Sequence, residues 1–210
     1  MNRINSHFGR PITGPDSRRN PVEPACVTPH RVLLAFFATL SLAGCLRYEP
    51  PPDTAQLPPG AFGTNGDQDV AALDIAALGF AHAIIGNPAK AAYAIAALDY
   101  LGGELNSNPR WVSMDPLVRL EMRDWRKRMR AEIGISPTAS SQAVVKTMLA
   151  LAGAYRNGDE TAVNRLLAAP IFTVPPAVVA DWLGDIPYAA NLNAATMSAD
   201  NAIMAPNFGE

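Results

Sequence analysis

Residues 67–103 read DQDVAALDIAALGFAHAIIGNPAKAAYAIAALDYLGG, and this stretch decides the fold of the chain. Asp67 and Asp69 suit the positive end of a helix dipole. Apolar residues then recur at helical spacing, at Val70, Leu73, Ala77, Leu78, Ala81, Ile84 and Ile85. The pattern predicts a first helix that ends at Gly86, because glycine readily adopts the left-handed turn that closes a helix. His82 falls late in this predicted helix.

A second helix is predicted almost immediately after the first. Asn87 is a favoured N-cap residue, and Pro88 is a favoured first residue of a helix. The apolar positions of this helix are Ala91, Ile95, Leu98 and Leu101, and the pair Gly102-Gly103 is expected to end it. Because so short a connection joins antiparallel neighbours, the sequence predicts a helical hairpin. Its many alanines allow the two helices to approach closely.

The chain beyond residue 114 continues in the same way. Helix start and stop signals predict three more helices, over residues 116–133, 141–157 and 159–167. After them we expect an extended piece at 171–174, a small helix at 176–182, weak helices over 189–204 and a frayed end at 205–210. The predicted fold class of residues 67–204 is therefore all-α, an irregular antiparallel bundle of about five main helices.

The N-terminal part has the order of a secretory signal. Residues 30–45 read HRVLLAFFATLSLAGC, in which Arg31 precedes eleven residues that are apolar except for Thr39 and Ser41. This run is roughly half of the ~20 residues that span a bilayer, so it is a poor transmembrane helix. A short buried core helix is the alternative interpretation.

The ending Leu42-Ala43-Gly44-Cys45 closely resembles the lipobox of bacterial lipoproteins. The resemblance implies that residues 1–44 are a leader, that Cys45 receives a diacylglycerol, and that the chain is cut before it. Leu46 stands where an Asp commonly retains Gram-negative lipoproteins in the inner membrane, so the resemblance implies an outer-membrane protein facing the periplasm. The match covers only the leader, and the family of the domain after it is not recognised.

Residues 45–66 are predicted to be a tether. Helix and sheet are both disfavoured there by Pro50, Pro51, Pro52, Pro58, Pro59, Gly60, Gly63 and Gly66. Such a spacer holds a folded domain away from a membrane surface, and we expect it to make no contact with the core.

Composition excludes several classes of function. Residues 45–210 carry 12 basic and 17 acidic side chains, a net charge near −5, which gives no general attraction to nucleic acid. Cys26 lies in the leader and Cys45 is expected to be lipidated, so no disulfide is expected in the domain. His82 is the single histidine after the leader, which leaves too few His and Cys ligands for a zinc cluster, and no G-x-S-x-G motif marks a catalytic serine. We therefore expect no metal, no cofactor and no catalytic set.

The predicted helix at 116–133 carries the most distinctive surface feature. A row of arginines recurs at spacings of four, three and four: Arg119, Arg123, Arg126 and Arg130. The row is expected opposite a buried stripe made of Val118, Met122, Trp125, Met129 and Ile133. It is a candidate surface for an anionic partner, because guanidinium groups bind oxyanions bidentately. The alternative is a solvated face with ion pairs four residues apart: Asp115–Arg119, Asp124–Arg128 and Arg128–Glu132.

Three weaker candidates remain. Two aspartate pairs have a spacing that permits acid–base work: Asp69 with Asp74, and Asp181 with Asp185. Glu104 is a loop-borne carboxylate of the kind that a glycosidase places in an apolar cleft. Trp125 is expected in the core, whereas Trp111 stays open between the core and a ligand groove.

The function expected from the sequence is that of a lipid-anchored accessory or scaffolding protein of the cell envelope. Its expected partners are the membrane, through lipidated Cys45, and another envelope protein, but not nucleic acid. Two alternatives stay open, namely an enzyme that uses carboxylates alone, comparable to a glycosidase, and a carrier of small apolar ligands.

The lipobox resemblance makes a direct prediction about anchoring. Wild-type protein should incorporate labelled palmitate and fractionate with membranes, whereas Cys45→Ser should do neither, because the acylated thiol is gone. Two or more acyl chains hold a protein stably, unlike a single short chain. Equal labelling of the two proteins would show that Cys45 is not the acylated residue.

Overall fold

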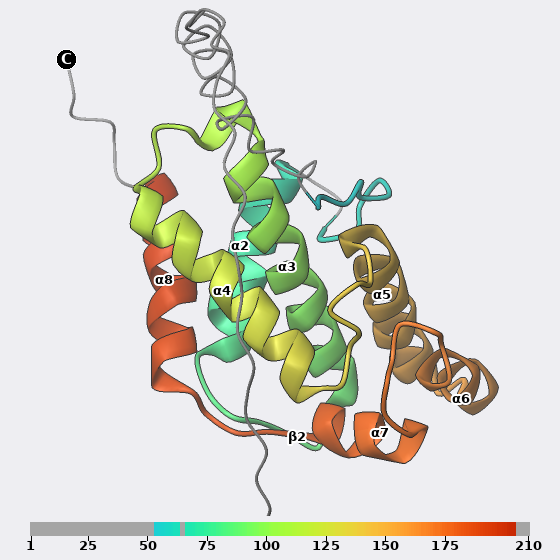
Figure 1. Ribbon diagram of the computed structural model, residues 1–210. Coiled ribbons are helices and arrows are strands. Elements are labelled where there is room, and N and C mark those ends of the chain that lie inside the picture. Colours follow the sequence, from blue (N-terminus) through green and yellow to red (C-terminus); the bar gives the residue numbers. More distant parts are fainter. Residues whose placement is uncertain (1–52, 64–65, 205–210) are drawn as a thin grey trace, which may run out of the picture. The chain divides into compact units, whose positions relative to one another are not determined.

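The computed structural model describes residues 53–63 and 66–204, and over these residues the fold is all-α, as predicted (Figure 1). Its helices are α2 (Gln68–Phe80), α3 (Pro88–Ser107), α4 (Pro116–Glu132), α5 (Ser141–Asn157), α6 (Glu160–Leu167), α7 (Pro176–Gly184) and α8 (Ala190–Met204). A 3₁₀ turn, η2 (Pro109–Trp111), and two short strands, β1 (Ile84–Ile85) and β2 (Asp185–Ile186), complete the described part. None of these helices combines the length and the apolar character that a membrane crossing needs. The leader, Cys45 and residues 205–210 lie outside the described residues.

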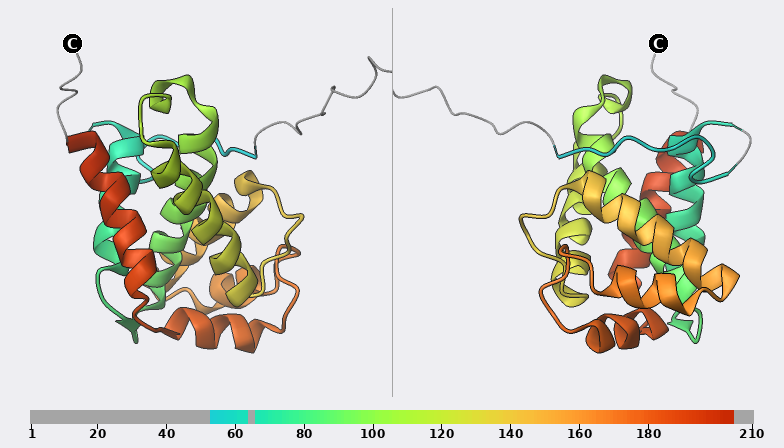
Figure 2. Two further views of the ribbon diagram at one scale, coloured as in Figure 1. Left: turned by 60° about the vertical axis from the view of Figure 1, so that its left-hand side comes forward. Right: turned by 90° about the vertical axis from the view of Figure 1, so that its right-hand side faces the viewer.

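Helix α3 is the centre of the domain (Figure 2). Of its 20 residues 13 are buried, and α2, α4, α5 and α7 all contact it. Its alanine-rich sequence is apolar on every side, a pattern typical of a helix that is covered all round. The small side chains bring neighbours close, as the sequence predicts: a Cβ added to Gly79 of α2 would lie 2.6 Å from the Cβ of Ala94 in α3.

Helix α2 begins where predicted but ends earlier. The Asp67 side chain caps it by accepting a hydrogen bond from the amide of Asp69, whereas its last residue is Phe80 rather than Ile85. Ile84 and Ile85 instead pair as a strand with residues 185–186, and the amide of Gly86 donates to the carbonyl of Gly184 at 2.8 Å. The apolar residues Ile84 and Ile85 therefore pair with a segment that is distant in sequence. His82 is exposed in the connection after α2 rather than late in a helix.

Helix α3 does not end at the Gly102-Gly103 pair, contrary to the prediction, but continues to Ser107. The two glycines are positions of close approach instead. A Cβ on Gly102 would lie 2.8 Å from the Cβ of Arg126 in α4, and one on Gly103 would collide with the backbone carbonyl of Asp53. The missing side chains thus let α4 and the segment at Asp53 pack directly on the α3 backbone.

The start of α4 and both ends of α5 follow from local caps, and they lie where the sequence predicts them. Asp115 caps α4, with its carboxylate 2.8 Å from the amide of Leu117. Ser140 caps α5 by accepting a hydrogen bond from the amide of Ala143 at 3.2 Å. Gly158 ends that helix in the left-handed conformation, with φ 65°. These ends depend on local hydrogen bonds, which explains why the sequence reveals them.

The segment at 53–63 packs on the domain, and the expectation that the tether makes no core contacts is wrong for these residues. Phe62 is 4% exposed and Ala55 is 6% exposed, and both belong to the core. The ring of Phe62 lies 5.6 Å from that of Tyr93 and 6.0 Å from that of Tyr100, so the segment adds an aromatic cluster to α3. The folded domain therefore begins at or before Asp53, and residues 45–52 lie outside the described part.

The close approach at Gly103 predicts a difference between two glycines that both lie inside helices. Gly103→Ala should lower the free energy of unfolding by about 1–3 kcal/mol, because the new Cβ forces the backbone at Asp53 away. Gly153→Ala in α5 meets no atom within 4 Å and should raise it by up to about 1 kcal/mol, since alanine is the better helix former. Urea unfolding measures both values. A stabilising Gly103→Ala would show that the 53–63 segment does not lie on α3.

Candidate functional site

The arginine row of α4 is divided between two environments rather than lying on one exposed face. Arg126 and Arg130 are buried, with 9% and 6% of their surface exposed, whereas Arg123 is exposed and Arg119 is half-buried. Trp125, expected in the core, is only partly buried at the other edge of the helix. The four arginines therefore do not form one continuous exposed face. The two C-terminal ones, Arg126 and Arg130, are buried on the side of α4 that also buries Met122 and Met129.

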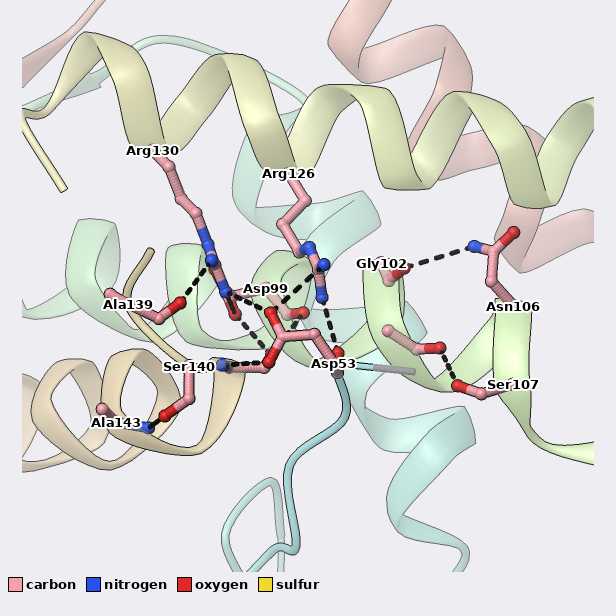
Figure 3. A network of polar contacts seen from close by, with 12 residues as sticks. Asp53, Asp99, Gly102, Asn106, Ser107, Arg126, Arg130, Ala139, Ser140 and Ala143 are labelled. Carbon is pink, nitrogen blue, oxygen red and sulfur yellow. Dashed lines mark hydrogen bonds and ion pairs between the residues drawn. The ribbon is translucent and has the colours of Figure 1, made fainter. Parts of the chain in front are cut away.

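Arg130 forms the strongest contacts of the site (Figure 3). Its guanidinium grips the carboxylate of Asp99 with two hydrogen bonds, Nε to Oδ2 at 2.6 Å and Nη2 to Oδ1 at 2.7 Å. Its Nη1 donates to the carbonyl of Ala139 at 2.8 Å. Asp99 lies in the middle of α3 and is 2% exposed, so it depends on this bidentate partner for its charge.

Asp53 joins the same site from the N-terminal segment (Figure 3). Its Oδ1 accepts a hydrogen bond from the amide of Ser141 at 2.6 Å, and its Oδ2 lies 3.4 Å from Nη2 of both Arg126 and Arg130. Its backbone carbonyl accepts from Nη1 of Arg126 at 2.9 Å. The Ser141 hydroxyl closes the network by donating to Oδ1 of Asp99 at 2.6 Å. The beginning of the domain is therefore attached to α3, α4 and α5 at one point.

Two arginines and two aspartates give this network, which we call the Asp53–Asp99 network, balanced charge. Burial lowers the pKa of Arg126. Burial also acts to lower the pKa of Arg130, but the hydrogen bond and charge of Asp99, with Asp53, raise it overall. The two aspartates thus offset the cost of burying the two guanidinium groups. Sequence reasoning missed both aspartates, although a single Asp within the apolar run AALDY is a detectable signal for a buried partner.

A second polar cluster uses Asp69, one of the residues considered for acid–base work. Asp69 is buried and accepts a hydrogen bond from the Tyr100 hydroxyl, and Nη1 of Arg110 lies 3.2 Å from its Oδ2. Arg110 also pairs with Asp67, and its hydrogen bond holds the pKa of Asp67 below the ordinary value. Burial raises the pKa of Tyr100, and the Asp69 carboxylate raises it further. The cluster ties α2 to α3 and η2 and leaves Asp69 no free side for catalysis.

Asp69 and Asp74 are not brought together as proposed, whereas Asp181 and Asp185 lie one turn apart, with the amide of Asp185 donating to the carbonyl of Asp181. Asp74 faces Asp200 of α8 rather than Asp69, and burial together with the Asp74 charge raises the pKa of Asp200. Asp181 and Asp185 are both exposed, at the end of α7 and in β2. Glu104 lies in α3, not in a loop, where its carboxylate accepts a hydrogen bond from the side chain of Asn108.

A surface groove between α4 and α8 contains several residues that the sequence analysis considered, among them Trp125, Asp124 and Arg128. It encloses about 410 Å³ and is lined by Glu121, Asp124, Trp125, Arg128, Asn191, Ala194 and Ser198. The guanidinium of Arg128 lies over the Trp125 ring, 5.0 Å from its centroid, and Asp124 pairs with Lys127 at 3.5 Å. Trp111, by contrast, is buried beneath Arg110 and belongs to the core.

A second groove runs between the N-terminal segment and α5. It encloses about 450 Å³ and is lined by Gln56, Leu57, Pro58, Gln142, Val145, Lys146 and Leu149. The amide side chain of Gln142 pairs with the backbone of Gln56 as a strand would, accepting at 2.7 Å and donating at 3.1 Å. This groove therefore exists because the 53–63 segment is docked, and it contains few groups with catalytic chemistry.

Comparisons with models of protein families, with curated proteins and with solved structures find no match to this chain. Among residues 53–63 and 66–204 no group of three or more His, Cys, Asp or Glu side chains is placed to hold a metal ion.

The buried network predicts a large stability effect for one cation of α4 and a small one for its neighbour. Arg130→Met should lower the free energy of unfolding by about 3–5 kcal/mol, because it leaves the Asp99 charge buried without a partner. Lys127→Met removes only an exposed pair with Asp124 and should change it by less than about 1 kcal/mol. Guanidinium unfolding measures both. Equal effects would show that Arg130 is not in the buried pair.

Proposed function

We propose that this protein is a lipid-anchored lipoprotein of the bacterial outer membrane, facing the periplasm, whose helical domain binds another envelope protein as an accessory or scaffold. The ending Leu42-Ala43-Gly44-Cys45 supports the anchor. The α4–α8 groove supports the binding role, and it is the observation that carries this part of the proposal.

The chemistry of the groove suits a polypeptide partner. Trp and Arg are the residue types that most often dominate the energy of protein interfaces, and here Trp125 and Arg128 stack on one another within the groove. Glu121 and Asp124 add acceptors, while Asn191 and Ser198 add groups that both donate and accept. A partner segment would place an apolar side chain against Trp125 and pair its backbone or basic groups with this polar surround.

A carboxylate-only enzyme is the second candidate, because Glu121 and Asp124 line the same groove. A glycosidase acid needs apolar surroundings that hold its proton at neutral pH. Glu121 is exposed and Asp124 already pairs with Lys127, so the groove favours binding over proton transfer. A carrier of small apolar ligands has weaker support, since the α4–α8 groove is open and largely polar.

Filling the groove tests the binding role. A photo-crosslinking residue at Ser198 in cells should capture a distinct partner, and adding Ala194→Trp should reduce the yield at least tenfold because the new ring occupies the groove. The matched control is Ala150→Trp, which places the same ring at an exposed alanine of α5 and should leave capture unchanged. Equal capture by both variants would remove the groove as the binding site.

A further inference from the structure

The docking of Asp53 shortens the connection to the membrane anchor, and this deduction rests on the proposed lipidation of Cys45. Eight peptide steps separate Cys45 from Asp53, and a fully extended chain spans at most about 3.3–3.6 Å per residue. The beginning of the domain therefore stays within about 29 Å of the acylated residue. A tether that reached to residue 66 would have allowed more than twice that distance, so the domain is held near the bilayer.

One edge of α4 flanks this attachment point. Leu120, Arg123 and Lys127 follow one another at spacings of three and four, which places them on a single stripe of the helix. The neighbouring stripe contains Arg126 and Arg130, the two residues that hold Asp53. Burial lowers the pKa of Arg126, and the positive charge of Arg123, three residues earlier on α4, lowers it further.

The stripe combines cations with apolar side chains, and the neighbouring carboxylate of Asp124 is paired with Lys127 at 3.5 Å. Arg123 is exposed, the side chain of Lys127 is 63% exposed, and Leu120 is 38% exposed. In the first turn of α4 the stripe is extended by Leu117, which is 67% exposed. Exposed apolar side chains beside cations are typical of surfaces that enter the headgroup region of an anionic membrane.

We propose that this edge of α4, formed by Leu117, Leu120, Arg123 and Lys127, lies on the phospholipid surface to which Cys45 is anchored. Leu117 and Leu120 enter between headgroups, and the two cations contact anionic phosphates. The rest of the domain is net negative, so the same field turns its other faces away from an anionic bilayer. Glu121, Trp125 and Arg128, which line the α4–α8 groove, lie on a different side of α4 from this edge. The groove therefore stays accessible to a partner.

Fluorescence quenching in vesicles tests the orientation. The full lipidated chain would carry a fluorophore on a cysteine introduced as Leu117→Cys or, as matched control, as Leu78→Cys in α2, a leucine of similar exposure. Spin-labelled phospholipids in vesicles that contain phosphatidylglycerol should quench the probe at 117 at least threefold more than the probe at 78. Equal quenching at the two positions would contradict the proposed orientation.

A second arm separates this inference from the lipidation proposal. At low salt and high vesicle concentration, the full chain with Cys45→Ser should bind phosphatidylglycerol vesicles reversibly but not pure phosphatidylcholine vesicles, a contact too weak to hold it on membranes during cell fractionation. Arg123→Gln with Lys127→Gln should weaken that binding roughly tenfold or more, because each cation near an anionic surface contributes to it. Lys146→Gln with Arg165→Gln, two exposed cations on α5 and α6, is the matched control and should bind as before. Equal losses in the two double variants would overturn the assignment of this edge, whatever the fate of Cys45.

Discussion

A carboxylate in the middle of an otherwise apolar helix is the constraint on which the rest of this structure depends. Asp99 of α3 is almost fully buried, and an unpaired charge there would cost several kcal/mol. Arg130 satisfies both of its oxygens, and the Ser141 hydroxyl adds a third contact. The position of α4 and the beginning of α5 are thereby set relative to the central helix. Apolar packing alone would permit small shifts among helices so rich in alanine, whereas a bidentate pair does not.

Arg130 and Arg126 bring an excess of positive charge to this buried region, and Asp53 balances it. That balance explains why a proline-rich segment, which has little tendency to form a helix or a sheet, is held on the domain. This has a geometric consequence for the proposed function. The chain joins the domain at Asp53, eight residues after the proposed anchor Cys45, rather than at residue 66, about twenty residues after it. The faces of α4 then have different roles: one holds the core, one lies beside the attachment point, and one borders the α4–α8 groove.

The sequence predicted those parts of the fold that depend on neighbours along the chain. Caps at Asp115 and Ser140 and the left-handed turn at Gly158 each involve residues within a few positions, so α4, α5 and α6 were placed closely. The errors arose where the deciding partner is distant. From the sequence alone, Gly103 indicates the end of a helix, but the structure shows that the backbone of Asp53 packs against it. Likewise, Ile85 continues the apolar stripe of the first helix in the sequence, but it pairs with residues 185–186 as a strand.

The arginine row shows the same limit at the level of the candidate site. Spacings of four, three and four define a stripe along the helix. They do not show which arginine of the stripe pairs with a buried carboxylate. The partner of Arg130 is Asp99, which lies 31 residues earlier in the chain. A long guanidinium side chain can serve the core as well as the surface, since its charge needs only a suitable partner. The α4–α8 groove was equally hidden, because its two walls come from helices that share no local pattern.

The central claim is that Asp53 is part of the fold, and the amide of Ser141 reports on it directly. First-turn amides of a helix have no partner within the helix and normally exchange rapidly with solvent. In the native full chain the Ser141 amide donates to Asp53, so its hydrogen exchange should be strongly protected and should accelerate at least a hundredfold in Asp53→Ala. The amide of Ala143, which donates to the Ser140 hydroxyl, should change much less. Exchange at Ser141 that is equally fast in both proteins would contradict the account.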